Sequence, residues 1–160
     1  MRRSRLLTVF LGLCVAVGLA PVLAAPAAAA TPRCTSWTTY YTRNSTQAVV
    51  HVPSSGYQNE VYNCELRLGD RNDAVKVLQR ALRYCYNYTN VAVDGEYGSI
   101  TSGAVRDFQH RMNSSQGADL DEDGIYGPET EDWLQFPVWT WPGNVRTNRC
   151  EHNPNPNPQP

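Results

Sequence analysis

The amino-acid sequence predicts a mainly α-helical protein: a small three-helix bundle with a short N-terminal β-hairpin-like extension and a disordered proline-rich tail. Two observations support this prediction. Apolar residues recur at helical spacing in three segments between residues 70 and 134. An eight-residue motif with two glycines and a tyrosine occurs twice, each time at the start of one of the last two segments.

The first thirty residues have the pattern of a secretory signal peptide. Met1–Arg5 carries three arginines and no acid, Leu6–Leu23 is almost wholly apolar, and an alanine-rich stretch ends at Ala30. This order favours residues 1–30 as a signal peptide cleaved after Ala30 over a membrane-spanning or lipid anchor. We therefore expect a secreted protein, extracellular or associated with the cell wall, with no membrane anchor in its mature form.

The charge of the mature chain, residues 31–160, excludes one class of partner. Without the three N-terminal arginines, 11 basic residues stand against 15 acidic ones, so the net charge is −4, and Lys76 is the single lysine. A basic surface for nucleic acid is missing, so we expect no nucleic-acid partner. The length allows one small domain with extensions, and we expect a monomer.

Both ends of the mature chain are predicted to be extensions. Residues 31–63 contain two strand-like runs, Ser36–Thr42 and Gln47–Val52, separated by turn-forming residues, which predicts a hairpin. Residues 137–160 form the C-terminal extension, and alternating prolines from 153 to 160 predict an exposed, extended tail.

Three helices are predicted between these extensions. The first runs from near Asn72 to Cys85, with Asp70 or Asn72 as its N-terminal cap. The second covers Ser99–Met112, where isoleucine, alanine, valine, phenylalanine and methionine form an apolar stripe. The third covers Pro128–Leu134, because proline suits the first helical position and acidic residues suit the first turns.

The repeated motif, Asp-Gly-x-Tyr-Gly-x-x-Thr, covers Asp94–Thr101 and again Asp123–Thr130. Asp-Gly predicts a tight turn, and the second glycine of each copy suits a backbone position with positive φ. We expect the tyrosine between the glycines to cover the apolar end of the bundle. The threonine should fall in the first turn of the following helix.

Together with Leu78-Gln79 and Phe108-Gln109, which occupy matching places in the first two helices, the repeat closely resembles the peptidoglycan-binding-domain-1 family. Members of this family are small three-helix modules, usually attached to bacterial cell-wall hydrolases. The resemblance covers residues 64–136. It implies a bacterial, extracytoplasmic protein whose partner is peptidoglycan, through its glycan strand or its stem peptide.

Several residues are candidates for contacting such a ligand. Tyr97 and Tyr126 offer rings that stack on amino sugars, or alternatively they plug the ends of the bundle. Gln109, like Gln79, could hydrogen-bond a stem peptide or brace a turn. The better exposed candidates are Arg83, Tyr86, Tyr88 and Arg106, since arginine holds carboxylates in bidentate fashion.

The favoured function is that of a secreted, non-catalytic module that binds bacterial peptidoglycan. The sequence contains no nucleophile elbow, no zinc-protease motif and no recognisable nucleophilic triad. One alternative is a secreted interaction or inhibitor protein that uses the aromatic run Trp139–Trp141 as its contact patch. A small cell-wall hydrolase is a further and less favoured alternative.

We expect no metal and no cofactor. Asp119, Asp121 and Asp123 match the opening of a calcium-binding EF-hand loop, but Thr130 stands at the twelfth position, where a glutamate is required. An acidic, solvated loop is therefore the better interpretation. The cysteines lack the paired spacing of zinc ligands.

The four cysteines of the mature chain predict two disulfides. If the segment after Cys64 doubles back along the first helix, the pairs are Cys64–Cys85 and Cys34–Cys150. The alternative pairing is Cys34–Cys64 with Cys85–Cys150.

Overall fold

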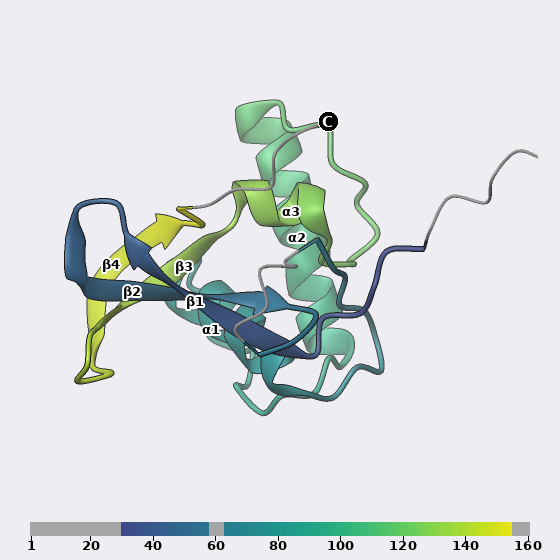
Figure 1. Cartoon of the computed structure of the whole chain (residues 1–160). Coiled ribbons are helices and arrows are strands. Elements are labelled where there is room, and N and C mark those ends of the chain that lie inside the picture. Colours follow the sequence, from purple (N-terminus) through teal and green to yellow (C-terminus); the bar gives the residue numbers. More distant parts are fainter. Residues whose placement is uncertain (1–29, 58–62, 155–160) are drawn as a thin grey trace, which may run out of the picture.

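The computed structural model describes residues 30–57 and 63–154. The expected signal peptide, apart from Ala30, and residues 155–160 of the proline-rich tail lie outside this range. The elements follow in the order β1 (Ser36–Thr42), β2 (Ser45–Ser54), α1 (Asp73–Cys85), α2 (Ser99–Gln116), α3 (Pro128–Trp133), β3 (Gln135–Thr140) and β4 (Arg146–His152) (Figure 1).

The fold is mixed α/β, so the prediction of a mainly α-helical bundle was wrong. The strands form a four-stranded antiparallel sheet in the order β1-β2-β3-β4. The predicted hairpin is confirmed as β1 and β2, but β3 and β4 complete the sheet from the end of the predicted helical region and the C-terminal extension. The sequence of β4 is polar and mostly exposed, because it is an edge strand, so it shows no apolar alternation.

Strand register divides the sheet into two faces. Val50 pairs with Val138, and both belong to the hydrophobic core that includes the buried residues of α1. Trp139 pairs with Val49, the residue before Val50, and therefore lies on the opposite face. His51 lies on the same face as Trp139, and Arg80 of α1 also reaches this face, with its guanidinium carbon 5.7 Å from the Trp139 ring centroid.

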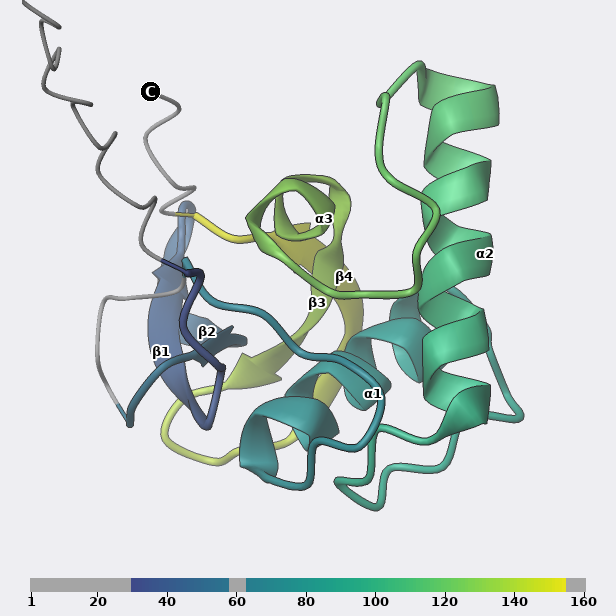
Figure 2. The same ribbon diagram turned by 90° about the vertical axis from the view of Figure 1, so that its right-hand side faces the viewer.

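α1 packs against β1, β2 and β3 and lies between the sheet and α2 (Figure 2). Asn72 caps α1 by accepting a hydrogen bond of 3.1 Å from the amide of Val75. The three predicted helices are confirmed, although α2 continues to Gln116 and ends at Gly117, which has φ +69°.

The disulfides are Cys34–Cys64 and Cys85–Cys150. The favoured pairing was therefore wrong, and the alternative is the one that the structure contains.

The reason lies in the path of the chain after Cys64, which does not double back along α1. Leu66 instead exchanges hydrogen bonds of 2.8 and 2.9 Å with Tyr126 in the loop before α3. Arg33 and Glu65 form a parallel bridge, which places Cys34 beside Cys64. Cys150, in β4, lies at the end of α1 and pairs with Cys85.

Candidate functional site

Each copy of the repeated motif is built around a buried glutamine from the preceding helix. In the first copy, Nε2 of Gln79 donates to Asp94 Oδ1 (2.8 Å), to the Glu96 carbonyl (3.0 Å) and to Thr101 Oγ1 (3.3 Å). Its Oε1 accepts from the amide of Gly95 at 2.9 Å. A single side chain thus fixes the turn and the first turn of the next helix.

Gln109 does the same in the second copy. It donates to Asp123 Oδ1 (3.1 Å), the Ile125 carbonyl (3.0 Å) and Thr130 Oγ1 (3.2 Å), and accepts from the Gly124 amide at 2.9 Å. Both its donor and its acceptor groups are engaged and the side chain is buried. These contacts favour the interpretation that Gln109 braces a turn over the one in which it bonds a stem peptide.

The glycine with positive φ is the first of each copy, not the second as predicted. Gly95 has φ +83° and Gly124 φ +72°, whereas Gly98 and Gly127 lie at negative φ. A Cβ atom at position 124 would stand 2.7 Å from the carbonyl oxygen of Ser102. Backbone conformation and the close approach of α2 both require glycine there.

Tyr97 and Tyr126 are core residues, with 1% and 0% of their surface exposed. The Tyr97 hydroxyl donates to the Gly124 carbonyl at 2.9 Å, which links the two motifs. The Tyr126 hydroxyl has no hydrogen-bond partner among the described residues. Both rings are enclosed, which favours the alternative interpretation that they plug the ends of the bundle.

The two candidate arginines differ in their accessibility. Arg83 donates to the carbonyls of Thr89 (2.7 Å) and Val91 (2.8 Å), so it holds the loop after α1 in place. Arg106 is exposed and makes a single long contact of 3.2 Å to the Asp123 carbonyl.

Tyr88 belongs to a polar cluster beside α2. Its hydroxyl donates to Asp107 Oδ2 at 2.6 Å, and the guanidinium of Arg111 lies 5.9 Å from its ring centroid. Burial, followed by the hydrogen bond to Asp107, raises the pKa of Tyr88 to about 12. The ring is thus fixed by two charged neighbours.

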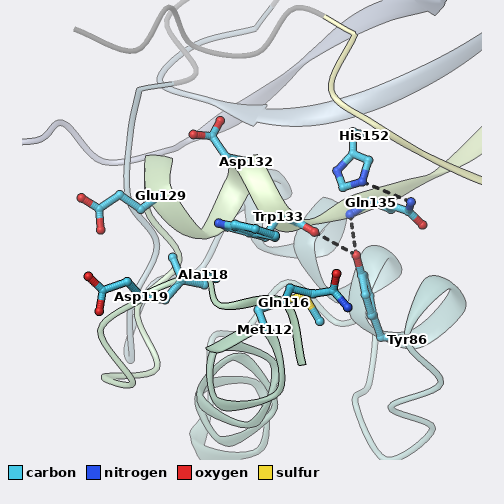
Figure 3. Close-up of a pocket in the computed structure, with 11 residues that line it drawn as sticks. Tyr86, Met112, Gln116, Ala118, Asp119, Glu129, Asp132, Trp133, Gln135 and His152 are labelled. Carbon is cyan, nitrogen blue, oxygen red and sulfur yellow. Dashed lines mark hydrogen bonds between the residues drawn. The ribbon is translucent and has the colours of Figure 1, made fainter. Parts of the chain in front are cut away.

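A hollow of about 870 Å³ opens between the end of α2, the following loop, α3 and the sheet (Figure 3). We call it the α2–α3 groove. Of the sequence-predicted candidates, it contains only Tyr86. Its lining comprises Tyr86, Met112, Gln116, Ala118, Asp119, Leu120, Glu129, Asp132, Trp133, Gln135 and His152.

One side of the α2–α3 groove is a fixed aromatic wall. The Tyr86 hydroxyl donates to the Trp133 carbonyl (3.3 Å) and accepts from the Gln135 amide (2.8 Å), while its ring packs edge-on against Phe108. Burial raises the pKa of Tyr86, so its hydroxyl stays protonated at neutral pH. Gln135 also contacts His152 at 3.2 Å. These contacts hold the wall in one geometry before any ligand arrives.

The other side carries negative charge. Figure 3 shows Asp119 and Glu129 across the Trp133 ring from Tyr86, with Asp132 above that ring. A second hollow of about 480 Å³ shares Leu120, Glu129 and Asp132 with the groove and extends it. Arginine and lysine are missing from both linings, so the groove suits rings and nitrogen donors and disfavours carboxylates.

A buried carboxyl lies behind the groove. Glu131 of α3 is 2% exposed, accepts a hydrogen bond of 2.7 Å from Asn153, and leaves its Oε2 without a partner among the described residues. Burial raises the pKa of Glu131 to about 8. Asn153 itself is buried, which corrects the prediction that the exposed tail begins there.

Sequence reasoning missed most of the groove because its lining comes from elements that are far apart in the sequence, from the end of α1 to β4. Trp133 was expected to face inward, and it does so only partly. The one available signal was an aromatic residue on a short helix surrounded by the acids 119, 129 and 132. His152 and Gln135 join the site only through the sheet, which was not predicted.

Metal binding has no assembled site in the described residues, where no three His, Cys, Asp or Glu side chains converge suitably. In the acidic loop, Asp123 Oδ1 accepts from Gln109 and from the Ile125 amide at 2.8 Å. None of the described helices has the length and apolar character required to cross a membrane.

The described chain thus combines two glutamine-braced turns with a groove beside α3. Residues 71–134 match the family model described as "Putative peptidoglycan binding domain". The matched segment contains both copies of the repeated motif, and the model is that of the family which these motifs resemble. No curated protein and no solved structure matches the chain. The family and the two disulfides together indicate an extracytoplasmic, cell-wall-associated protein.

Proposed function

We propose that this chain is a secreted, non-catalytic module that binds peptidoglycan in the α2–α3 groove. One observation carries the proposal: this groove is lined mainly by residues of the family-matched segment 71–134. The predicted signal peptide at residues 1–30 supports secretion.

The groove offers two kinds of contact to a peptidoglycan chain. The rings of Trp133 and Tyr86 would pack against a sugar ring or an apolar side chain of the stem peptide. The carboxylates of Asp119 and Glu129 would accept hydrogen bonds from acetamido, peptide or ammonium N–H groups. Since these contacts are short-range, and the mature chain has net charge −4, binding should change little between low and physiological salt.

Sedimentation with purified insoluble peptidoglycan tests the proposal. The mature protein should pellet with the wall material, and Trp133→Ala or Glu129→Gln should weaken binding roughly tenfold, the loss of about one good contact. Asp73→Asn is the matched control for Glu129→Gln, because Asp73 is an exposed acid on the far helix α1. Equal recovery in the supernatant with and without peptidoglycan would contradict binding.

The non-catalytic part of the proposal has its own readout. After incubation with the same wall material, the supernatant should contain no newly released reducing sugars or free amines. Release that depends on the protein and stops when Glu129 or Asp132 is replaced by its amide would instead make the groove an active site.

A further inference from the structure

We propose that the face of the sheet that carries His51 and Trp139 holds a second ligand site, for a pyranose sugar that bears a carboxylate. A pocket of about 370 Å³ lies there, which is within the size range of small-molecule sites. We call it the aromatic pocket. Its principal lining residues are Trp37, His51, Tyr57, Arg80, Trp139 and Trp141.

The rings of the aromatic pocket form walls. Trp37 meets Tyr57 at 82° with centroids 5.3 Å apart, and meets His51 at 83° with centroids 6.3 Å apart. His51 lies 6.1 Å from Trp139 at 47°. Of the lining rings, Tyr57 and Trp141 are 66% and 44% exposed, and exposed aromatic faces can pack against the C–H side of a sugar.

Three strands hold these rings on one face. Thr39 of β1 pairs with His51 of β2, and Thr39 Oγ1 lies 3.1 Å from His51 Nδ1. Trp139 of β3 pairs with Val49, two residues from His51. The strands lie outside the matched segment 71–134, Arg80 lies inside it, and the pocket shares no lining residue with the α2–α3 groove.

Arg80 makes the pocket positive. Its guanidinium carbon lies 5.7 Å from the Trp139 ring centroid, and the side chain is only half-buried. It takes part in none of the ion pairs found among the described residues, and no acid belongs to the lining. A guanidinium without a carboxylate partner is suited to bind one from a ligand.

His51 adds no second charge. Burial, and then the charge of Arg80, lower the pKa of His51 to about 4, so the imidazole is neutral at pH 7. It can exchange hydrogen bonds with sugar hydroxyls. The pocket thus combines one cation, neutral polar groups and aromatic side chains. An acidic sugar ring can use all three, whereas a polyol phosphate has no ring to pack against the aromatic side chains.

Tryptophan fluorescence provides a test that is local to this site. Three of the four tryptophans line the aromatic pocket, and Trp133→Phe removes the fourth, which lies in the α2–α3 groove. This variant is titrated with a β-1,4-linked glucuronic acid hexamer and, as the neutral match, with cellohexaose. We expect a saturable change of emission with the acidic hexamer and binding at least tenfold weaker with the neutral one.

Further substitutions in the Trp133→Phe protein measure how much Arg80 and Trp37 each contribute to binding. Arg80→Gln should weaken binding of the acidic hexamer at least tenfold, while the exposed control Arg43→Gln should leave it unchanged. Trp37→Leu, which keeps Arg80, should also weaken it, so the test does not depend on how well one variant folds. Glu129→Gln should reduce sedimentation with peptidoglycan yet keep the response to the acidic hexamer, so the two proposals can fail separately.

Three results would overturn the inference. They are no saturable change with the acidic hexamer, equal affinity for the neutral hexamer, and unchanged affinity in both Arg80→Gln and Trp37→Leu.

Discussion

The helical segment 71–134 and the four-stranded sheet are built by different means. In the helical segment the decisive contacts are local: Gln79 reaches Asp94, 15 residues away, and Gln109 reaches Asp123, 14 residues away. In the sheet, β2 pairs with β3 from the other end of the chain, and a disulfide with a sequence separation of 65 fastens β4 to α1. Hydrogen bonds between residues close in sequence therefore hold the helical segment together. The sheet depends on strand pairing and a disulfide between distant parts of the chain.

The largest loss of stability should come from removing the disulfide between Cys85 and Cys150. Replacing Cys85 and Cys150 together by alanine should lower the free energy of unfolding by about 4 kcal/mol, because the unfolded chain regains the entropy of a long loop. The Cys34–Cys64 pair, with a sequence separation of 30, should cost slightly less, about 3.5 kcal/mol. Urea unfolding of both double variants measures this, and a larger loss at Cys34–Cys64 would contradict it.

The next largest loss of stability is expected on replacing the two buried glutamines. Gln79→Ala and Gln109→Ala should each lower the free energy of unfolding by about 2–4 kcal/mol, since buried amide and carbonyl groups lose their partners. The two values should be similar, because the hydrogen-bond sets match. Gln116→Ala, an exposed glutamine of α2, is the control and should change stability by less than about 0.5 kcal/mol. Equal small effects at all three positions would show that the braces are dispensable.

The same contrast explains what could be predicted from sequence. Helix positions, the Asn72 cap and the first hairpin follow from periodicity and turn residues close together in the chain. The polar strand β4 becomes a strand only by pairing with β3, and the disulfide partners depend on where Leu66 docks. The α2–α3 groove could not be assembled from the sequence because it requires both regions.

A third prediction concerns Glu131, which joins the two regions through Asn153. In the unfolded chain a glutamate ionises near pH 4.5, but in the folded protein the pKa of Glu131 is about 8. Between these values the unfolded state binds fewer protons, so stability should fall as pH rises from 4.5 to 8. Glu131→Gln should therefore stabilise the protein by about 1–3 kcal/mol at pH 8 and confer no such gain below pH 4.5.

Thermal unfolding across this pH range measures the effect. Glu129→Gln, which changes an exposed neighbour, should show little pH-dependent difference from the wild type. A gain from Glu131→Gln that is the same at pH 4 and pH 8 would contradict the assignment.

The smallest changes of stability are expected at the two tyrosines of the repeated motif, and they should differ between the two positions. Tyr97→Phe removes a buried hydrogen bond to the Gly124 carbonyl and should cost about 1 kcal/mol. Tyr126→Phe removes a buried hydroxyl without a partner among the described residues, so it should be neutral or slightly stabilising. Chemical denaturation distinguishes the two, and a greater loss for Tyr126→Phe would show that its hydroxyl has a partner.

The central claim, that the α2–α3 groove binds peptidoglycan, is tested most directly by amide and indole chemical shifts. A soluble muropeptide is titrated into the isotopically labelled mature protein. We predict saturable shifts that cluster at the Trp133 indole, Leu120 and Gln135, with the α1 face that packs on the sheet unaffected. Shifts confined to the face of the sheet that carries His51 and Trp139, or none at ligand concentrations that saturate sedimentation, would contradict the claim.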